Sequence, residues 1–373
     1  MRISLLTYST KPRGGVVHTL ALAEALAAAG EDVEVWTLGR GGDTRFHRPV
    51  DPAVRVRVVP FVDRDGEDVG ARILRSITEL AAALAEDGLP GDVVHAQDCL
   101  SANAALAVRA DVLRTVHHID HFTTPELAAC HEKALREPAG FVCVSGAVAR
   151  ELADGWGLRA AVIPNGVDVT RFAAAADPDD QVAAERRAGW RARLGRYVLA
   201  VGGIEPRKGT ADLVEAMATV RARRPDVSLV LAGGDTLFDY RGYREDVLVR
   251  AVELGVDPVL LGPVPHDDLP SVVAAAAVFA FPSTKEGFGL AAMEALAAGV
   301  PLVGRDLPVL REVFGGTARF ASGHAELADS LVDALDRWDA GRAALGRHLA
   351  DRHTWVAAAQ EHLRLYRERR DRH

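Results

Sequence analysis

The stretch from Phe281 to Val300, FPSTKEGFGLAAMEALAAGV, decides the fold of this chain. The apolar run Val278–Phe281 predicts a buried parallel strand that stops at Pro282. The alanine-rich segment after Gly289 predicts a helix that ends at Gly299. A strand, a glycine loop and a helix N-terminus in this order present free backbone N–H groups to an anion. The stretch therefore predicts a βα unit with an anion-binding loop.

Two carboxylates accompany this loop. With Glu286 in the loop and Glu294 in the second turn of the helix, both reach one pocket at the carboxyl end of the strand. Gly287 and Gly289 leave room for a ligand to approach the backbone. Carboxylates that touched a phosphate would repel it, so these two are better suited to accept hydrogen bonds from neutral hydroxyls. A ligand with a central diphosphate and a hydroxyl-rich sugar at each end meets both demands.

The longer string PSTKEGFGLAAMEALAAGVPLV resembles the signature of family-4 retaining glycosyltransferases of the GT-B fold. The resemblance implies that Glu286 contacts the transferred sugar and that Glu294 holds the ribose of the nucleotide. It also implies that the backbone of the loop approaches the sugar and diphosphate; the loop residues are Gly287, Phe288, Gly289 and Leu290. The resemblance covers nearly the whole chain, and it is specific around residues 162–168, 198–209 and 279–303.

The bulk composition is that of a soluble globular protein with more than one core. A chain of 373 residues is too long for one ordinary core, so two domains are expected. The net charge of −8 argues against a nucleic-acid-binding protein, which usually has a basic balance. The three cysteines form no CxxC pair and suggest neither a disulfide framework nor a zinc site. No apolar run reaches the length of a membrane span, and the cytosol is the expected compartment.

Strand-like and helix-like patterns alternate along the chain, which predicts an α/β protein with parallel sheets covered on both faces. The resemblance implies the GT-B architecture of two Rossmann-like, doubly wound domains that face each other across a cleft. The amphipathic last helix is expected to cross back to the first domain. The expected bounds are residues 1–172 for an acceptor-side domain that the last helix, 353–373, joins, 173–190 for a linker and 191–352 for a nucleotide-sugar-binding domain.

Gly14-Gly15 follow the first predicted strand and precede a helix. One interpretation is a tight turn, and the other is a backbone-lined wall of an active-site cleft. The resemblance favours the second, because relatives carry a glycine pair here that faces the donor. The segment PNGVD at Pro164–Asp168 also resembles the family, and both the residues and the resemblance predict mainly a turn there.

His117 ends a strand in the segment RTVHHIDHF, and ends of parallel strands line the ligand crevice. The histidines match no metal-site spacing, and no metal is expected. The resemblance implies that His117 closes on the transferred sugar near the reacting carbon. His118, His121 and Thr123 then fall in a loop that meets the acceptor.

A second strand–glycine loop–helix unit contains GGIEPRKGT. The resemblance places Lys208 on the donor diphosphate, but Gly203 stands where the family has an arginine. Either Arg207 supplies the second cation, or Lys208 acts with helix N-termini alone. The loop from Gly262 to Val264 matches one that contacts the base through its backbone.

These observations predict a retaining glycosyltransferase that moves a sugar from a nucleotide diphosphate sugar to a small soluble acceptor. His117, Glu286 and Lys208 are the expected catalytic residues, and no permanently bound cofactor is expected. The alternatives are another GT-B nucleotide-sugar enzyme of the epimerase kind and a non-catalytic nucleotide-sugar-binding partner subunit. The first predicted helix carries no Lys or Arg, so attraction to an anionic membrane is not supported. Neither glycine loop carries the fingerprint of a dinucleotide-dependent oxidoreductase.

Overall fold

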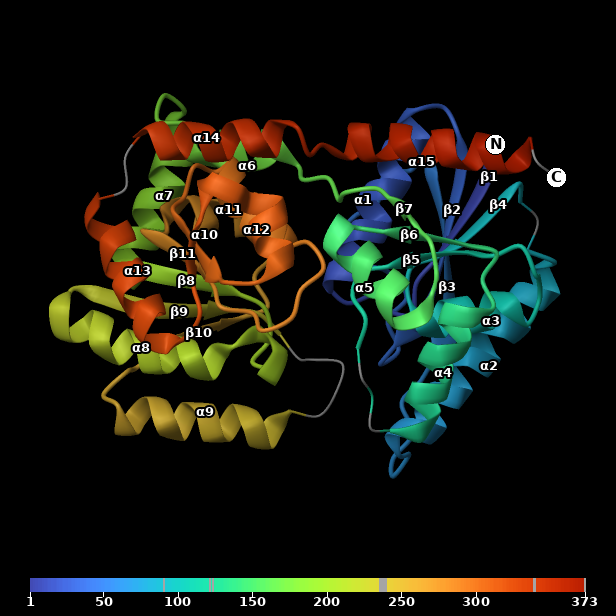
Figure 1. Cartoon of the computed structure of the whole chain (residues 1–373), viewed down its shortest axis with the longest axis horizontal. Helices are drawn as coiled ribbons and strands as arrows, with labels where there is room; N and C mark the ends of the chain where they lie inside the picture. The colour runs from blue at the N-terminus through green and yellow to red at the C-terminus, as the bar shows by residue number, and fades with distance from the viewer. Residues whose placement is uncertain (90, 121, 123, 235–239, 338–339, 372–373) are drawn as a thin grey trace. The chain divides into compact units, whose positions relative to one another are not determined.

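The computed structural model describes residues 1–89, 91–120, 122, 124–234, 240–337 and 340–371 (Figure 1). The chain divides into two compact units. Unit 1 comprises Met1–Gly166 and the C-terminal segment from Trp355, and unit 2 comprises Val167–Thr354. Each unit is built on its own parallel sheet, which confirms the predicted pair of Rossmann-like domains.

Unit 1 holds a seven-stranded sheet in the order β3-β2-β1-β4-β5-β6-β7, with every neighbouring pair parallel. Its strands are β1 (Arg2–Leu6), β2 (Asp32–Arg40), β3 (Val54–Phe61), β4 (Val93–Ala96), β5 (Leu113–Val116), β6 (Gly140–Cys143) and β7 (Ala161–Val162). Its helices are α1 (Gly14–Ala28), α2 (Val69–Asp87), α3 (Cys99–Leu106), α4 (Pro125–Arg136), α5 (Gly146–Trp156) and α15 (Trp355–Arg370).

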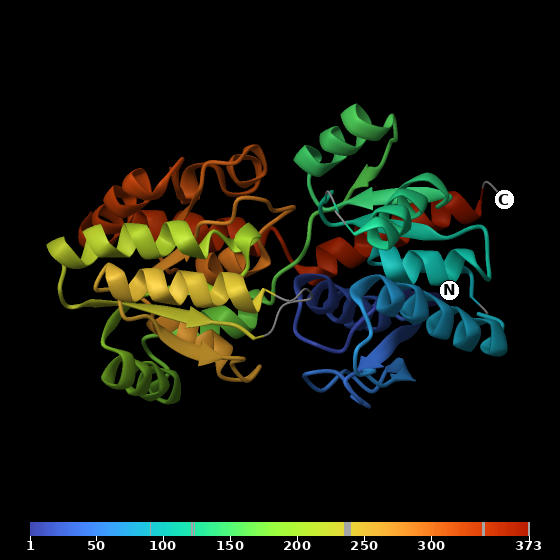
Figure 2. The ribbon, with the colours of Figure 1, turned by 90° about the horizontal axis from the view of Figure 1, so that it is seen from below.

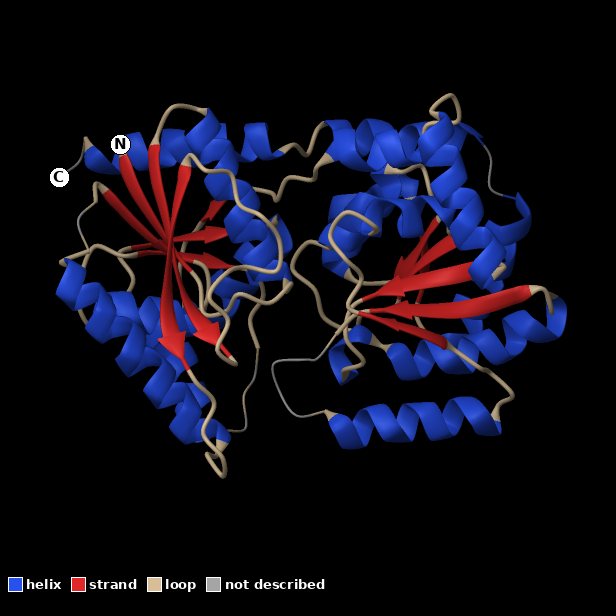
Figure 3. Cartoon of the chain, turned by 180° about the vertical axis from the view of Figure 1, so that it is seen from behind, coloured by secondary structure: helices blue, strands red, loops and turns tan. Residues whose placement is uncertain are grey.

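Successive side chains of β1 enter two different cores, because strand side chains alternate between the faces of a sheet. Leu5 packs on one face in a cluster with Leu20 of α1 and Leu363 of α15. Leu6 packs on the other face with Leu80 of α2. Each such side chain contributes about 1.5–3 kcal/mol by burial. Figure 3 shows the resulting helical layers on both faces of the sheet.

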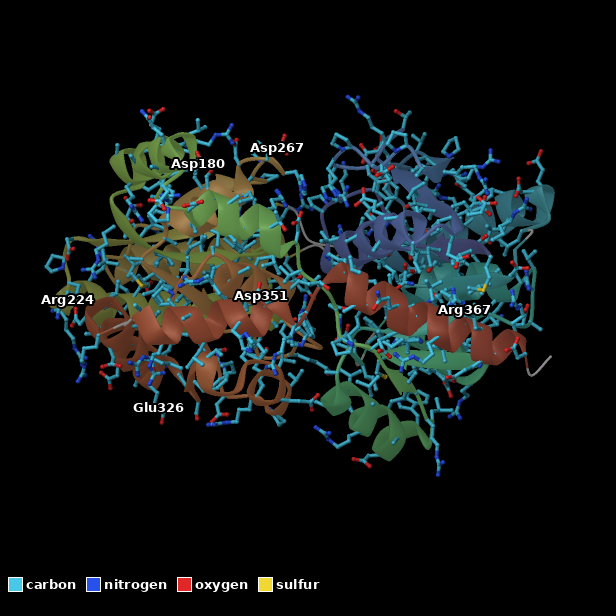
Figure 4. The ribbon with its side chains drawn as sticks, turned by 90° about the horizontal axis from the view of Figure 1, so that it is seen from above. Asp180, Arg224, Asp267, Glu326, Asp351 and Arg367 are labelled. Carbon is cyan, nitrogen blue, oxygen red and sulfur yellow. The ribbon has the colours of Figure 1, made fainter. Side chains whose placement is uncertain are left out.

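The last helix, α15, belongs to the core of unit 1 although it follows the whole of unit 2 in the sequence. Tyr366 is 1 % exposed, and its hydroxyl lies 2.7 Å from His95 Nδ1 on β4. Arg367, labelled on α15 in Figure 4, lies 3.5 Å from Glu31. These contacts confirm the predicted return of the C-terminal helix to the first domain.

Unit 2 holds a six-stranded parallel sheet in the order β10-β9-β8-β11-β12-β13. Its strands are β8 (Arg196–Val201), β9 (Val227–Ala232), β10 (Val259–Gly262), β11 (Val278–Phe281), β12 (Leu302–Arg305) and β13 (Arg319–Ala321). Its helices are α6 (Val169–Ala176), α7 (Gln181–Leu194), η1 (Pro206–Lys208), α8 (Thr210–Arg223), α9 (Arg241–Glu253), α10 (Leu269–Ala275), α11 (Leu290–Ala297), α12 (Pro308–Phe314), η2 (Gly315–Thr317), α13 (His324–Arg337) and α14 (Ala340–Asp351). Helices α8 and α9 run side by side in Figure 2.

The strand order of unit 2 creates a switch point between β8 and β11. The chain leaves β8 toward β9 and β10, then returns to form β11 on the other side, where Val198 pairs with Val278. In open α/β sheets, ligands bind outside the carboxyl ends of the strands at such a point. The two glycine loops selected from the sequence follow these two strands. The fold therefore brings them together.

The predicted elements around the deciding stretch match the structure: β11 ends at Phe281, and α11 begins at Leu290. At the N-terminus β1 ends at Leu6, and α1 begins at Gly14, whereas the glycine pair was expected to precede the helix. Gly14 and Gly15 are thus the first two residues of a helix. Residues 173–190, expected to be a linker, contribute to two helices of unit 2, α6 and α7.

Candidate functional site

The loops after β8 and β11 are joined at backbone level. The Thr284 N–H donates to the Arg207 carbonyl at 2.8 Å. Gly209 has φ +66°, and a Cβ there would lie 2.1 Å from the Pro282 carbonyl oxygen. A side chain would therefore force the loops apart, and only glycine fits the close approach.

Charged side chains from both loops meet at Glu286. Lys208 Nζ lies 2.6 Å from Glu286 Oε1, and Arg207 Nη1 lies 3.2 Å from the same oxygen. Arg207 Nη2 also donates to Glu205 Oε1 at 2.9 Å. The Glu286 side chain is 11 % exposed, so this pairing is better shielded from water than a surface ion pair. Two cations thus converge on one carboxylate at the switch point.

Arg207 lies in the same loop as the glycine at position 203. Gly203 is half-buried and follows Gly202, while the guanidinium of Arg207 reaches Glu286 from within the short helix η1. A second cation is therefore present beside Lys208, supplied from four residues further along the chain.

Glu294 lies in the second turn of α11, and the residue is half-buried. Burial raises its pKa to about 7; Arg171 lowers this pKa and Asp168 raises it. Asp168 caps α6 by accepting the Arg171 N–H at 3.1 Å, and the Arg171 guanidinium donates to the His266 carbonyl. Charged residues of α6 and its N-cap therefore act on the Glu294 carboxyl. Arg171 also connects α6 to the loop after β10.

The glycine loop itself is tightly packed. Gly289 has φ +100°, and a Cβ there would lie 3.0 Å from the Phe314 ring. Phe288 is buried, with its ring centroid 5.6 Å from that of His353. Gly287 is also buried, whereas Leu290 and Val264 are half-buried. The loop backbone is therefore fixed by apolar packing.

The expected catalytic histidine of unit 1 lies against the glycine pair. His117 directly follows β5, and its Cδ2 and Nε2 are 3.7 Å from the position of a Cβ on Gly15. Burial, His118 and Arg114 lower the pKa of His117 to about 3, so its imidazole is neutral at physiological pH. The structure thus brings Gly15 and His117 together and exposes Gly14 beside them.

Two buried residues that pack near His117, His18 and Asn165, were not predicted from the sequence as part of the site. His18 on α1 is 1 % exposed, and its ring centroid lies 4.8 Å from that of His117. His18 Nδ1 lies 2.9 Å from Asn165 Oδ1, and Asn165 is 4 % exposed. The PNGVD segment is therefore more than a turn. The asparagine in PNGVD is visible in the sequence, but its partner lies 147 residues away, beyond the reach of any local pattern.

The expected acceptor residues are only partly described. His118 Nε2 lies 2.8 Å from Asp120 Oδ2. His121 and Thr123 lie outside the described residues. Within the described residues, no group of three or more His, Cys, Asp or Glu side chains could hold a metal ion. No helix in that part of the chain is long and apolar enough to cross a membrane.

Comparison with known proteins gives two family matches that together span most of the chain. Residues 12–171 match the model described as Glycosyltransferase Family 4. Residues 186–361 match the model described as Glycosyl transferases group 1.

Named relatives agree with these matches. The chain is 30 % identical to the D-inositol 3-phosphate glycosyltransferase of Pseudarthrobacter chlorophenolicus, over 100 % of this chain and 96 % of the relative. It is 30 % identical to the phosphatidyl-myo-inositol mannosyltransferase of Mycobacterium leprae, over 98 % and 96 %.

Solved structures give the same fold at lower identity. Sucrose-phosphate synthase from Thermosynechococcus elongatus superposes with a TM-score of 0.79 at 22 % identity, covering 98 % of each chain. The Anabaena protein Alr3699/HepE, solved with UDP and glucose, superposes with a TM-score of 0.76 at 21 % identity, covering 99 % of this chain and 100 % of that one. With the switch-point loops and the two family matches, these relatives show that the chain belongs to the family-4, group 1 glycosyltransferases and is a glycosyltransferase of the GT-B fold.

Proposed function

We propose that this enzyme transfers a sugar, with retention of anomeric configuration, from a nucleotide diphosphate sugar to a small soluble acceptor. The observation that carries the proposal is the convergence of Lys208 and Arg207 on Glu286 where β8 and β11 diverge. Two cations then lie beside a carboxylate that can accept hydrogen bonds from hydroxyls. This is the pairing that a sugar linked to a diphosphate requires.

The two cations act on the leaving group. Negative charge grows on the diphosphate as the glycosidic bond breaks, and a preorganised cation stabilises that charge. Lys208 and Arg207 are held in place by Glu286 and Glu205 before any ligand enters. Donor binding places the diphosphate against the cations and leaves Glu286 to accept hydrogen bonds from the sugar hydroxyls.

Glu294 receives the ribose of the nucleotide. A carboxyl whose pKa is about 7 is only partly ionised at neutral pH. Hydrogen bonds from two ribose hydroxyls favour the ionised form, so nucleotide binding lowers that pKa. The same carboxyl would repel a phosphate, which fixes the direction in which the nucleotide lies along the loop. The backbone near Val264 meets the base.

His117 acts as a neutral hydrogen-bonding partner of the transferred sugar. Its pKa of about 3 excludes a charged imidazolium as the resting form at pH 7. We assign no enzymic nucleophile: the departing phosphate takes the proton of the acceptor hydroxyl on the face from which it leaves. Gly14 and Gly15 let the donor approach the start of α1.

The test is a donor-turnover assay with wild type, Lys208→Met and Glu286→Gln, using Lys133→Met as a charge-matched control on the surface of α4. The proposal predicts slow donor hydrolysis by wild type and the control, strong acceleration when an acceptor is present, and an α-configured product from an α-configured donor. Loss of one stabilising group costs about 10²–10³ in rate.

Two outcomes would replace the proposal. Conversion of the donor to another nucleotide sugar without acceptor would identify an epimerase-like enzyme. Tight donor binding with neither transfer nor hydrolysis, whatever acceptor is offered, would identify a binding subunit. A product of inverted configuration would leave the transfer reaction standing and refute retention alone.

A further inference from the structure

Beyond the end of β1 in unit 1, Arg13 and Arg40 contact Tyr8, and Arg72 lies close enough to Arg40 to act on its charge. Arg13 precedes α1, Arg40 ends β2 and Arg72 lies in the first turns of α2. Figure 1 labels these three elements. All four side chains belong to residues that are half-buried. We call this group the arginine cluster. None of its members is among the residues that the reaction proposed above employs.

Contacts with Tyr8 hold two of the arginines in place. Arg13 Nη1 donates to the Tyr8 hydroxyl at 3.0 Å, and its Cζ lies 5.7 Å from the centre of the Tyr8 ring. Arg40 Nε donates to the Tyr8 carbonyl at 3.2 Å, and its Cζ lies 5.5 Å from the same ring centre. Arg40 Nη2 also donates to Ser76 Oγ at 2.9 Å. The two guanidinium groups are thus fixed against one aromatic ring.

The positive charge of the cluster is not neutralised by ion pairing. Among the described residues, no carboxylate lies within 4.0 Å of a guanidinium nitrogen of Arg13, Arg40 or Arg72. Neighbouring cations differ: Arg75 lies 2.6 Å from Glu67, and Lys11 lies 2.9 Å from Asp43. The carboxylates of Glu67 and Asp43 are therefore paired with cations outside the cluster.

Asp98 neutralises the positive charge of the arginine cluster only in part. Asp98, at the start of α3, raises the pKa values of both Tyr8 and Arg40. Burial raises the pKa of Asp98 itself to about 7, so this carboxyl is partly protonated at neutral pH. Arg72 also acts on Glu67, whose carboxylate is held by Arg75. The cluster keeps a net positive charge.

This arrangement costs stability in the protein without a ligand. Burial lowers the pKa of Arg40, and the like charges of Arg72 and Arg13 lower it further. In addition, Arg13 Nε is buried without a hydrogen-bond partner in the described part of the chain. A buried donor left without a partner destabilises the folded protein, because it loses its hydrogen bonds to water and gains none in return. An anion that accepted hydrogen bonds from these groups would remove both penalties.

The position of the cluster indicates which ligand the anion belongs to. Arg13 directly precedes Gly14 and Gly15 in the sequence. A Cβ on Gly15 would lie 3.7 Å from the His117 ring. The donor diphosphate already has its cations in unit 2. A second cationic site beside the expected transfer histidine therefore suits the other substrate.

We propose that Arg13, Arg40 and Arg72, with the Tyr8 hydroxyl, bind an anionic group of the acceptor, a phosphate or a carboxylate. Guanidinium groups bind both anions through paired, charge-assisted hydrogen bonds. The inference rests on the proposed function, because it assigns the acceptor to unit 1. It narrows the substrate class from any small hydroxyl compound to a hydroxyl compound that carries a negative charge.

The test measures thermal stabilisation by inorganic phosphate and by D-inositol 3-phosphate, with sodium chloride at matched ionic strength as the reference. All proteins carry Lys208→Met, so that the diphosphate site of unit 2 does not contribute. Into this background we place Arg13→Gln, Arg72→Gln, or Arg159→Gln, the last an exposed arginine between α5 and β7, where helix-to-strand connections lie at the opposite edge of the sheet.

The proposal predicts that both anions raise Tm in the background and in Arg159→Gln, and that Arg13→Gln and Arg72→Gln lose most of this rise. Arg72→Gln is expected to fold at least as stably as its parent without anion, because it removes like-charge repulsion. Equal stabilisation of all four proteins, or an equal effect of chloride, would overturn the proposal. Arg13→Lys retains the charge and is expected to keep part of the effect.

Two further measurements are needed. The first distinguishes a lipid headgroup from a soluble acceptor as the source of the anion, and the second tests the anion site separately from the proposed function. Binding to phosphatidylinositol vesicles but not phosphatidylcholine vesicles, lost in Arg13→Gln and Arg72→Gln, would identify a lipid headgroup. Stabilisation by free D-inositol 3-phosphate would identify a soluble acceptor. Without the Lys208→Met change, donor stabilisation is expected to survive Arg13→Gln and Arg72→Gln. If no donor stabilises the wild type, the proposed function fails while the anion site stands.

Discussion

At the scale of single residues, the candidate site contains two carboxyl groups in different surroundings. Glu286 is held by two cations, whereas Glu294 is half-buried, and burial raises its pKa to about 7. One glutamate thus faces the site as a paired carboxylate, and the other titrates near neutrality. Under the proposed function, Glu286 is expected to bind hydroxyls of the transferred sugar and Glu294 those of the ribose.

The raised pKa of Glu294 predicts a pH-dependent nucleotide affinity. Because ribose hydroxyls bind the carboxylate better than the acid, the dissociation constant should rise as pH falls below about 7, by up to tenfold per pH unit. Calorimetric titration with the preferred nucleoside diphosphate between pH 5.5 and 8 measures this. Glu294→Gln should bind more weakly and without that slope; an unchanged slope in the variant would assign the titration to another group.

At the scale of secondary-structure elements, the site depends on the contact between the loops after β8 and β11. Gly209→Ala places a Cβ 2.1 Å from the Pro282 carbonyl, so we expect a loss of more than about 2 kcal/mol of unfolding free energy and of at least tenfold in donor affinity. Gly255→Ala is the matched control: its φ is +67°, but nothing lies within 4 Å. The control should lose about 1 kcal/mol and keep donor affinity. Thermal unfolding and donor titration compare them, and equal donor affinities would contradict the account.

Helix α15 brings a buried histidine into unit 1 and should make stability depend on pH. Burial lowers the pKa of His362 to about 4, below its ordinary value near 6.5. The unfolded chain binds this proton first, so the stability contribution is complete above pH 6.5 and is lost as pH falls toward 4.

In the wild type, the unfolding free energy is expected to fall as pH falls from 6.5 to 4.5. His362→Gln should make this slope smaller by up to about 1.4 kcal/mol per pH unit. Urea unfolding at several pH values measures the slope. The exposed His348→Gln on α14 serves as the control and should keep the wild-type slope. Parallel slopes in all three proteins would show that His362 does not carry the effect.

The sequence predicted the elements of the site well and their cross-connections poorly. Strand, glycine loop and helix follow from local periodicity and from Gly289, so β11 and α11 lay where expected. The partnership of Asn165 with His18 could not be predicted, because it joins the end of the first domain to its first helix. The arginine cluster was missed for the same reason: three isolated arginines form no local pattern until the sheet order places β1 beside β2.

At the scale of the whole molecule, the two units are expected to divide the work between nucleotide binding and transfer. Glu294 belongs to unit 2 and His117 to unit 1. Glu294→Ala should weaken nucleoside diphosphate binding at least tenfold. His117→Ala should leave that affinity within about threefold of wild type but lower kcat by about 10²-fold or more. Calorimetry and initial rates separate these effects. Equal losses of nucleotide affinity in both variants would refute the division.

The most direct test of the central claim is a thermal-shift screen of UDP, GDP, ADP and TDP sugars against wild type, Lys208→Ala and Glu294→Ala. A ligand that binds only the folded state raises Tm. The account predicts that one nucleotide class stabilises the wild type and that both variants lose this stabilisation. If no nucleotide sugar raises the Tm of the wild type at millimolar concentration, the claim that unit 2 binds a nucleotide sugar is contradicted. Arg207 then does not replace the arginine that the family has at position 203.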